Sequence, residues 1–458
     1  MKLIQYYLDC LSHASYLVGD ETTGRAVVLD PQRDVSEYLA DAEKFGFTIE
    51  LVLETHFHAD FVSGHLELAE ATGAAIVYSS VAEPEFEFKG VSDGERYSLG
   101  EVTLEFRHTP GHTPESLSIV VYEHADASPY GVFTGDTLFI GDVGRPDLLA
   151  SIGYARDELA SMLYDSLHDK LMTLPDPTRV YPAHGAGSAC GKNLSTELSS
   201  TIGDQKLANY ALHAPDKATF IALVSEGQPP APDYFIYDAV LNRKAHDLLD
   251  ESEMPTAMSY EEVRRALDEG AVLIDGRSTD EFARGHFRDA INIGLDGRYA
   301  EYTGSVLSPD TDIVLLTTPG QDLEGKNRLA RIGFDRVTGY LDLPYDSMVE
   351  HPDDVRVASR LTATTLRERA AELEGLQLVD VRNPGETADG VIPGAIEIPL
   401  AQLARRLDEL DAARPTVVYC AGGYRSSIAS SLLRQRGFAD VSDLIGGYAA
   451  WEQVAPAA

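Results

Sequence analysis

The N-terminal half of the chain alternates between short apolar runs and longer amphipathic segments. The apolar runs are bounded by turn-forming residues and predict strands. They lie at 2–8, 15–18, 25–29, 49–53, 76–78, 102–107, 117–122 and 130–133. Apolar residues at helical spacing predict helices at 35–45, 63–72, 158–171 and 196–212, and Ser63 is the predicted cap of the second. This alternation predicts an α/β domain.

The C-terminal half contains two copies of one pattern. Residues 273–277 (LIDGR) are echoed by residues 378–382 (LVDVR), and residues 285–293 are echoed by residues 390–398. The next predicted strands are 312–316 and 416–419. Similarity that returns at a fixed distance along the chain indicates an internal repeat.

Two segments are predicted to separate domains. Residues 242–258 are charged and contain Pro255, and residues 351–359 are the expected linker between the two copies. We therefore predict an α/β multidomain protein with domains at residues 1–245, 256–350 and 359–458.

A cluster of potential metal ligands follows the predicted strand 49–53. The stretch Thr55-His56-Phe57-His58-Ala59-Asp60 places two imidazoles and a carboxylate at alternate positions, where they can converge on one ion. Three further candidates each end an apolar run: His112, Asp136 and His184. Histidines that only cap helices or fill a core would not repeat this pattern, so we predict a metal site.

The residues leave the choice of metal open. His56, His112 and Asp136 would form a two-histidine, one-carboxylate face that leaves positions free for substrate and oxygen on iron(II). Zinc in the same ligands would instead activate water for hydrolysis. The remaining candidates are outer groups or ligands of a second metal: His58, Asp60 and His184. Phe61 stands where one more ligand would complete that second site, which favours a single metal.

A second candidate chemistry lies in the last domain. Cys420 ends an apolar strand and is followed by Gly422, Gly423 and Arg425 at the start of a predicted helix. Backbone N–H groups of such a loop, the helix N-terminus and the arginine would stabilise a thiolate or persulfide. The matching stretch 317–322 of the first copy has no cysteine, so that copy cannot do thiol chemistry.

The other cysteines give weaker signals. Three cysteines without close pairs are not a disulfide framework and suit a reducing compartment. Cys190 lies six residues after His184, and Lys192 is near enough in sequence to favour a thiolate. Cys190 could carry sulfur at the metal pocket or be a small buried residue in a tight loop, and both readings stay open.

The charge of the chain limits its partners. The 74 acidic and 37 basic residues give a net charge of −37, spread along the whole sequence. Such a charge repels nucleic acid and anionic membranes, so we expect neither as a partner. The first residues lack the features of a signal peptide, and no apolar run is long enough to span a membrane, so we expect a cytoplasmic protein.

The acidic excess has two explanations. It could be an adaptation to a salt-rich cytoplasm, where the charges are screened and keep the protein soluble, or the protein could simply be an acidic mesophilic enzyme. In the first case the melting temperature should rise with KCl. Best stability at low salt would exclude the halophilic explanation.

The motifs resemble known families. THFHAD, TPGHTP, FTGD and YPAHG, in this order, resemble the αββα metallo-β-lactamase fold and its glyoxalase-II-like branch. The stretch GRPD at residues 144–147 is similar to the persulfide dioxygenases of that branch. The two copies resemble rhodanese domains, with DVR at 380–382, GVIPGAIEIP at 390–399 and the CxxGxRS loop at 420–426. The chain as a whole is similar to fused persulfide dioxygenase–rhodanese enzymes.

The resemblance implies roles for individual residues. One iron(II) per chain would be held by His56, His112 and Asp136, with His58, Asp60 and His184 as outer groups. Arg145 would help to hold the thiol carrier of the substrate. Cys420 would be the sulfurtransferase nucleophile, supported by Arg425, with Asp380 and Arg382 ordering its loop. Fused relatives also tend to have a cysteine near the iron, where Cys190 stands. Phe61 and Val391 depart from the families' usual histidines.

The resemblance implies a bifunctional enzyme. Iron-dependent oxygenation of a low-molecular-weight persulfide by O2 would give sulfite and thiol, and Cys420 would transfer sulfane sulfur between persulfide, sulfite and thiosulfate in either direction. Two alternatives stay open: a thioester hydrolase of the glyoxalase II type, and a non-catalytic persulfide carrier that uses Cys420. The identity of the thiol is also open, as is a homo-oligomer formed through the middle copy.

Overall fold

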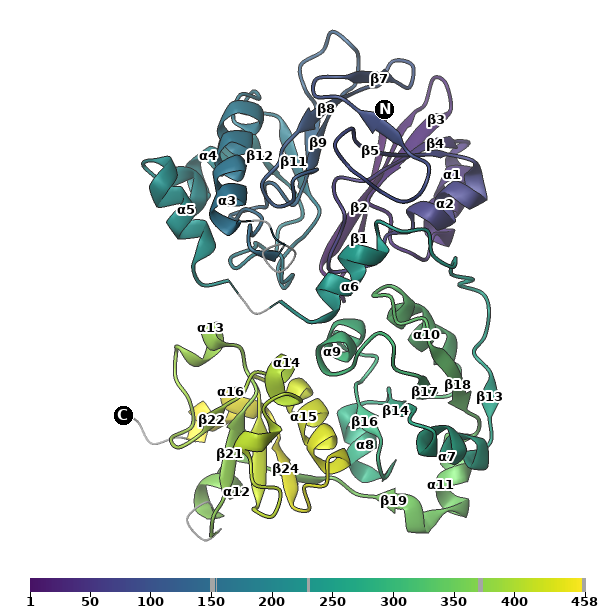
Figure 1. Cartoon of the computed structure of the whole chain (residues 1–458), viewed down its shortest axis with the longest axis vertical. Helices are drawn as coiled ribbons and strands as arrows, with labels where there is room; N and C mark the ends of the chain where they lie inside the picture. The colour runs from purple at the N-terminus through teal and green to yellow at the C-terminus, as the bar shows by residue number, and fades with distance from the viewer. Residues whose placement is uncertain (149–152, 154, 229–230, 370–373, 455–458) are drawn as a thin grey trace. The chain divides into compact units, whose positions relative to one another are not determined.

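The computed structural model describes residues 1–148, 153, 155–228, 231–369 and 374–454 (Figure 1). They form two compact units, Met1–Ala231 with Phe235–Leu249, and Pro232–Tyr234 with the chain from Asp250 onward. The limits of three domains at 1–245, 256–350 and 359–458 stay a prediction. No helix in these described ranges is long and apolar enough to cross a membrane.

The first unit contains two six-stranded sheets. The first sheet consists, in spatial order, of β1 (Lys2–Leu8), β2 (His13–Asp20), β3 (Arg25–Leu29), β4 (Thr48–Leu53), β5 (Ala75–Ser79) and β6 (Lys89–Val91). The second consists of β12 (Ser200–Thr201), β11 (Arg179–Pro182), β10 (Gly131–Gly135), β9 (Leu117–Tyr122), β8 (Thr103–His108) and β7 (Arg96–Ser98). The strands from β3 to β6 run parallel, and β10 and β11 also run parallel.

Helices cover the outer faces of both sheets. The first sheet carries α1 (Ser36–Phe45) and α2 (His65–Thr72), and the second carries α3 (Arg156–Asp165), α4 (Ile202–Ala208) and α5 (Lys217–Ser225), as Figure 1 shows. Alternation along β3 explains the layers, because Val27 and Leu29 enter the core between the sheets whereas Val28 enters the core under α1. This α/β/β/α arrangement confirms the predicted architecture.

Most predicted elements are confirmed, with two corrections at helices. Ser63 does not cap α2, which begins at His65; the Ser63 hydroxyl instead donates to Glu54 Oε1 at 2.5 Å and is thereby committed to the core. The helix predicted at 196–212 is wrong in its first part. Ser200 and Thr201 pair with β11, and the Thr201 side chain then caps α4 by accepting from the Asp204 N–H.

The second unit contains two five-stranded parallel sheets with the same strand order, which confirms the internal repeat. The middle repeat has β13 (Ala257–Met258), β18 (Val337–Leu341), β17 (Ile313–Leu316), β14 (Val272–Asp275) and β16 (Ile291–Asn292). The last repeat has β20 (Ser359–Leu361), β24 (Val441–Leu444), β23 (Thr416–Tyr419), β21 (Gln377–Asp380) and β22 (Ile396–Glu397).

Helices surround both sheets of the second unit. They are α7 (Tyr260–Asp268), α8 (Thr279–Arg284), α9 (Tyr299–Val306), α10 (Asp322–Ala330) and α11 (Pro344–Glu350) in the middle repeat. In the last repeat they are α12 (Ala363–Arg369), α13 (Pro384–Thr387), α14 (Leu400–Leu403), α15 (Tyr424–Gln435) and α16 (Gly447–Val454). The predicted linker at 351–359 is partly structured, because β19 (Val355–Arg356) pairs with β15 (His286–Phe287).

Candidate functional site

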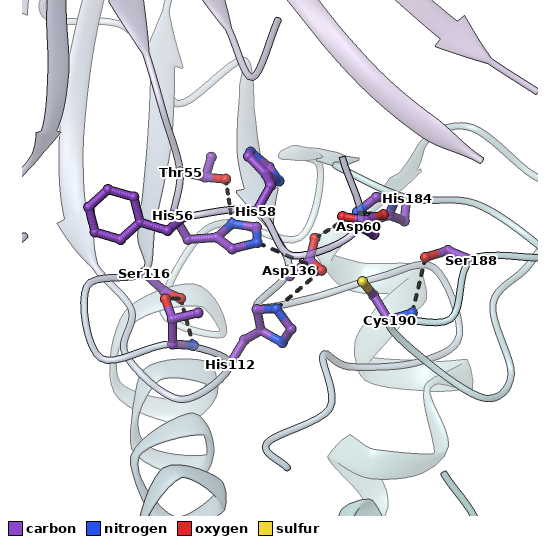
Figure 2. Close-up of polar contacts among 12 residues, drawn as sticks. Thr55, His56, His58, Asp60, His112, Ser116, Asp136, His184, Ser188 and Cys190 are labelled. Carbon is purple, nitrogen blue, oxygen red and sulfur yellow. Dashed lines mark hydrogen bonds and ion pairs between the residues drawn. The ribbon is translucent and has the colours of Figure 1, made fainter. Parts of the chain in front are cut away.

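The ends of four strands in the first unit bring the predicted metal ligands together. His56 follows β4, His112 follows β8, Asp136 directly follows β10 and His184 follows β11. All four side chains are buried. Figure 2 shows His56 and His112 turned toward the Asp136 carboxylate.

Three of these side chains have the geometry of a ligand set. Asp136 Oδ2 lies 3.5 Å from His112 Nε2 and 4.0 Å from His56 Nε2. One donor atom from each of the three residues lies within 4.8 Å of the others. An ion between them would therefore be within reach of all three side chains.

Hydrogen bonds on the far side of each ring fix which nitrogen faces the cluster. The Nδ1 atom of His112 donates to the Arg145 carbonyl at 2.9 Å, and that of His184 donates to the Ser12 carbonyl at 3.1 Å. Thr55 Oγ1 gives its proton to Asp30 and accepts from His56 Nδ1 at 2.9 Å. Each Nε2 therefore presents a lone pair, which is the tautomer that a metal requires.

The unsatisfied atoms of the cluster fit a metal ion. Both carboxylate oxygens of Asp136 and the Nε2 atom of His184 are buried and have no hydrogen-bond partner among the described residues. Burial, with neighbouring imidazoles such as His58, lowers the pKa of His56 well below its ordinary value, so its ring is neutral. The buried Asp136 carboxylate, which has no hydrogen-bond partner among the described residues and faces the neutral His56 ring, would gain a compensating charge from a bound cation.

His58 lies in two other groups of potential ligands, one with Asp60 and His184 and one with Asp30 and Glu54. Its Nε2 atom lies 3.1 Å from Asp30 Oδ1 and 3.5 Å from Glu54 Oε2. Burial alone would lower the pKa of His58, but these two carboxylates raise it well above its ordinary value. The His58 Nε2 atom is thus directed to the carboxylates, which favours an outer position for this residue over a place in the main ligand set.

Asp60, His184 and Cys190 form the other side of the cluster. His184 Nε2 lies 3.3 Å from Asp60 Oδ2 and 3.5 Å from Asp136 Oδ1. The Cys190 sulfur is turned toward Asp136 (Figure 2), and donor atoms of Cys190, His184 and Asp136 lie within 4.8 Å of one another. The structure therefore brings Cys190 to the metal cluster.

The expectation that Lys192 favours a Cys190 thiolate is wrong. The Lys192 ammonium donates to the carbonyls of Leu223 and Glu226, so it is directed to another part of the unit. Burial, followed by the carboxylates of Asp60 and Asp136, raises the pKa of the Cys190 thiol well above its ordinary value.

Position 61 is filled by an apolar ring. Phe61 is buried, and its ring centroid lies 4.0 Å from that of His13 and 4.4 Å from that of His58. The side chain has no atom that can bind a metal. Any second ion would therefore depend on Asp60, His184 and their neighbours.

Arg145 connects His112 to the loop that carries Cys190. Its guanidinium is buried, pairs with Asp147 at 2.7 Å and donates to the Ala189 carbonyl at 3.0 Å. Its backbone N–H donates to the Cys190 carbonyl, and its carbonyl accepts from His112. The structure thus gives Arg145 a role in ordering this loop, and binding of a thiol carrier stays a prediction.

Asn242 holds the loop that runs from His58 to Ser63, which follows the potential ligand His56. The sequence did not predict this role. Asn242 is fully buried at the end of α6 (Tyr234–Leu241). Its side-chain amide donates to the carbonyls of His58 and Phe61 at 2.8 and 2.7 Å and accepts from the Ser63 N–H at 2.9 Å. An asparagine 184 residues from His58 in sequence gives no pattern that would predict these contacts.

Asn242→Ala should lower the affinity of the first unit for Fe(II) by about tenfold to a hundredfold, because the loop that carries the ligands loses three hydrogen bonds. Anaerobic titration against a chromophoric chelator measures this affinity. Asn193→Ala, at an exposed asparagine, is the matched control and should bind iron like the wild type. Equal affinity in both variants would contradict the role of Asn242.

In the second unit, Cys420 sits in a loop that surrounds its sulfur. The buried sulfur accepts a hydrogen bond from the Gly423 N–H at 3.1 Å. The Cys420 thiol in turn donates to the Ser426 hydroxyl oxygen at 3.6 Å. Gly423 has a φ of 115°, a conformation that favours glycine, and α15 begins at the next residue. The sulfur therefore lies at a helix N-terminus, as predicted.

Two ion pairs lie around this loop. Arg425 forms a two-point ion pair with Glu386 at 2.6 and 2.7 Å. Asp380 pairs with Arg382 at 2.6 Å, and the Arg382 guanidinium lies over the Tyr448 ring at 3.9 Å. The Tyr448 N–H donates to the Cys420 carbonyl.

Sequence reasoning missed Glu386. The available signal was the Asn383-x-x-Glu386 capping pattern at the start of α13, which the structure contains.

The matching loop of the middle repeat is filled by its own side chains. Thr317 occupies the position of the cysteine and donates to the Asp322 carboxylate at 2.7 Å. Asp322 is buried and stands where the last repeat has Arg425. A carboxylate in place of a guanidinium disfavours an anionic ligand in this loop.

Family comparisons agree with this architecture. Residues 8–184 match the metallo-beta-lactamase superfamily, and residues 259–347 and 362–454 each match the rhodanese-like domain. The persulfide dioxygenase ETHE1, mitochondrial, of Bos taurus is 33% identical over 172 residues, which are 37% of this chain and 63% of that relative. The chain therefore spans less than two thirds of that relative's length.

Two further comparisons cover more of the matched protein. A hydroxyacylglutathione hydrolase of Rhodospirillum rubrum is 34% identical over 223 residues, which are 48% of this chain and 77% of that protein. The crystal structure of a metallo-beta-lactamase from Staphylococcus aureus aligns with a TM-score of 0.66 and 33% identity, covering 74% of this chain and 98% of that one. This alignment therefore extends beyond the first domain of the chain. The chain belongs to the metallo-beta-lactamase superfamily and carries two rhodanese-like domains after its metallo-beta-lactamase domain.

Proposed function

We propose that the metallo-beta-lactamase domain is a persulfide dioxygenase and that the last rhodanese-like domain is a sulfurtransferase acting on related sulfur compounds. The reaction of the first domain is RSS⁻ + O2 + H2O → RSH + SO3²⁻ + H⁺, in which the terminal sulfur is oxidised and O2 is reduced. The observation that carries this proposal is the two-histidine, one-carboxylate cluster of His56, His112 and Asp136, together with Phe61 in place of a further ligand for a second metal.

One iron(II) per chain is the proposed cofactor. His56, His112 and Asp136 would hold it, and it would supply the redox chemistry that joins dioxygen to sulfur. The neighbouring side chains prepare the site: Thr55 and the Arg145 carbonyl fix the two imidazoles in their ligand tautomers. Phe61 adds an apolar surface beside His58, and the burial of the cluster residues would limit the access of bulk water to the reacting sulfur.

Cys190 and Arg145 are proposed to act on the substrate. The Cys190 sulfur is turned toward Asp136, and in this proposal it would exchange sulfur with the persulfide. Arg145 would contact the thiol carrier by giving up part of its pairing with Asp147 to a carboxylate of the ligand. Asp60 and His184 would remain outer groups that position the pocket.

The last domain would handle sulfane sulfur through Cys420. The Cys420 thiolate attacks the terminal sulfur of a second persulfide and releases the thiol; the Cys420 persulfide then gives that sulfur to sulfite, as CysSS⁻ + SO3²⁻ → CysS⁻ + S2O3²⁻. The Gly423 N–H and the positive end of α15 stabilise the sulfur anion in both steps. Arg425, held by Glu386, would add positive charge beside the sulfur, and Asp380 with Arg382 would hold the loop that contains Gly422 and Gly423. The reverse direction from thiosulfate uses the same groups.

The fused arrangement raises the concentration of sulfite available to Cys420, because both sites are on one chain. No disulfide joins the three cysteines in the part of the chain that the structure describes, which suits a reducing compartment, and we propose a cytoplasmic location. Glutathione, coenzyme A and other small thiols are all compatible carriers.

A thioester hydrolase is the second candidate, favoured by the similarity to the hydroxyacylglutathione hydrolase. Its two-metal form would need Asp60 and His184 as ligands, and Phe61 deprives that site of an imidazole. Purified protein loaded with either iron or zinc should be tested with S-lactoylglutathione and with glutathione persulfide. Oxygen uptake with the persulfide on the iron form supports the dioxygenase, whereas rapid thioester hydrolysis on the zinc form without such uptake supports the hydrolase.

A non-catalytic persulfide carrier is the third candidate. It predicts a persulfide on Cys420 without oxygen uptake by any metal form.

A further inference from the structure

The loop that surrounds Cys420 is attached to the middle repeat through one side chain. Tyr424 follows Gly423 directly, and its hydroxyl donates to the Gly294 carbonyl of the middle repeat at 2.5 Å. Its ring centroid lies 5.6 Å from that of Tyr302 on α9. Burial raises the pKa of Tyr424 far above its ordinary value, so the phenol keeps the proton that it donates.

The middle repeat has a surface shaped for this ring. A Cβ atom at Gly297 would lie 2.5 Å from the Tyr424 ring, so only glycine leaves room for it. The segment 294–297 is held from behind by Arg328 of α10, which donates to the carbonyls of Leu295 and Gly297. Contacts within the middle repeat therefore hold the segment that Tyr424 contacts.

The helix that begins at this loop is also attached to the middle repeat. The Ser427 hydroxyl donates to the buried side chain of Asn292 at 2.6 Å, and the Asn292 N–H donates to the Ser431 hydroxyl at 3.0 Å. Asn292 lies in β16, the edge strand of its sheet, so α15 covers that edge. Both the start and the first turns of α15 thus depend on contacts with the other repeat.

We propose that Tyr424 is a positioning residue for sulfur transfer, and that the cysteine-free middle repeat is the platform that holds it. The Gly423 N–H that contacts the sulfur is adjacent to Tyr424, so a displaced ring would rotate this donor away from Cys420. The inference rests on the proposed sulfurtransferase activity for its kinetic consequence. The structural part of the inference, that Gly297 affects the surroundings of Cys420 through Tyr424, does not depend on that activity.

Two variants of the full-length chain test the coupling. Gly297→Ala pushes on the ring from the middle repeat, because the three atoms nearest to the added Cβ all belong to Tyr424, and Tyr424→Phe removes only the hydroxyl. We expect kcat/KM for thiosulfate, with cyanide as acceptor, to fall by about tenfold in Gly297→Ala and by less in Tyr424→Phe. The fall should lie mainly in kcat, and persulfide-dependent oxygen uptake should be unchanged.

Alkylation of Cys420 gives a readout that does not need the activity. The rate of its reaction with iodoacetamide at one pH, followed by mass spectrometry of the Cys420 peptide, should change severalfold in both variants. Gly285→Ala is the matched control, since a Cβ there meets no atom closer than 3.7 Å and its φ of 177° suits any residue. This control should react like the wild type.

The outcomes separate the two proposals. Wild-type rates of both sulfur transfer and alkylation in Gly297→Ala would overturn the positioning role. A lower melting temperature with wild-type alkylation would also overturn it, because that pattern is one of stability alone. A wild-type chain without sulfurtransferase activity would refute the proposed function, and the alkylation rates would still decide whether Gly297 and Tyr424 control Cys420.

Discussion

His112→Ala should lose persulfide-dependent oxygen uptake by more than about a hundredfold, together with most of its bound iron. Loss of a group that only orients a metal ligand lowers metal affinity or activity by about tenfold to a hundredfold, and removal of the ligand itself should lower them further. His112 supplies an Nε2 atom 3.5 Å from Asp136 Oδ2, and without it only His56 and Asp136 of the set of three would remain to hold the ion. An oxygen electrode and metal analysis of the same sample measure both effects.

His124→Ala is the control for this variant. His124 is exposed on the first unit, with 68% of its side chain accessible, and it is outside the cluster. It should keep wild-type iron content and uptake. If His112→Ala retained oxygen uptake at the wild-type rate, His112 would not be a ligand of the reacting metal.

Cys420→Ala should keep wild-type oxygen uptake and release sulfite in place of thiosulfate. Without the sulfur that carries the transferred atom, thiosulfate formation should fall about a thousandfold or more, to the rate of the uncatalysed reaction. The described cluster of His56, His112 and Asp136 contains no atom of the second unit, so the oxygenation should not change. Ion chromatography separates sulfite from thiosulfate after a measured amount of oxygen has been consumed.

Cys10→Ala is the matched cysteine control, because Cys10 lies in the turn between β1 and β2 and is in none of the metal-binding sets found among the described residues. It should produce thiosulfate like the wild type. Unchanged thiosulfate output in Cys420→Ala would refute the coupling of the two activities.

The sequence predicted the layers of this protein well where burial follows a simple period. The strand 117–122 has the same limits in the structure as in the prediction, because all of its residues are buried and turn residues bound it. Prediction failed where a side chain can form hydrogen bonds with partners near in sequence or with partners that only the folded structure brings close. Serine is a common helix-capping residue, yet the Ser63 hydroxyl donates a hydrogen bond to Glu54, which comes close only in the folded sheet.

The candidate site was predictable for a related reason. His112, Asp136 and His184 follow β8, β10 and β11, which run in the same direction in one sheet and so end at a common edge, and His56 follows β4 of the other sheet. For these residues, a place at the end of an apolar run implied proximity in space, and the same place identified Cys420 after β23. Asn242 and Tyr424 could not be predicted in this way. Their partners, the carbonyls of His58 and Gly294, are backbone atoms that carry no mark in the sequence.

Oxygen consumption by anaerobically iron-loaded protein, on addition of glutathione persulfide, tests the central claim most directly. We expect rapid uptake of one O2 for each persulfide, with one iron per chain and sulfite or thiosulfate as product. No uptake with glutathione persulfide or with any other small persulfide, from protein that holds its iron, would contradict the dioxygenase and favour the hydrolase.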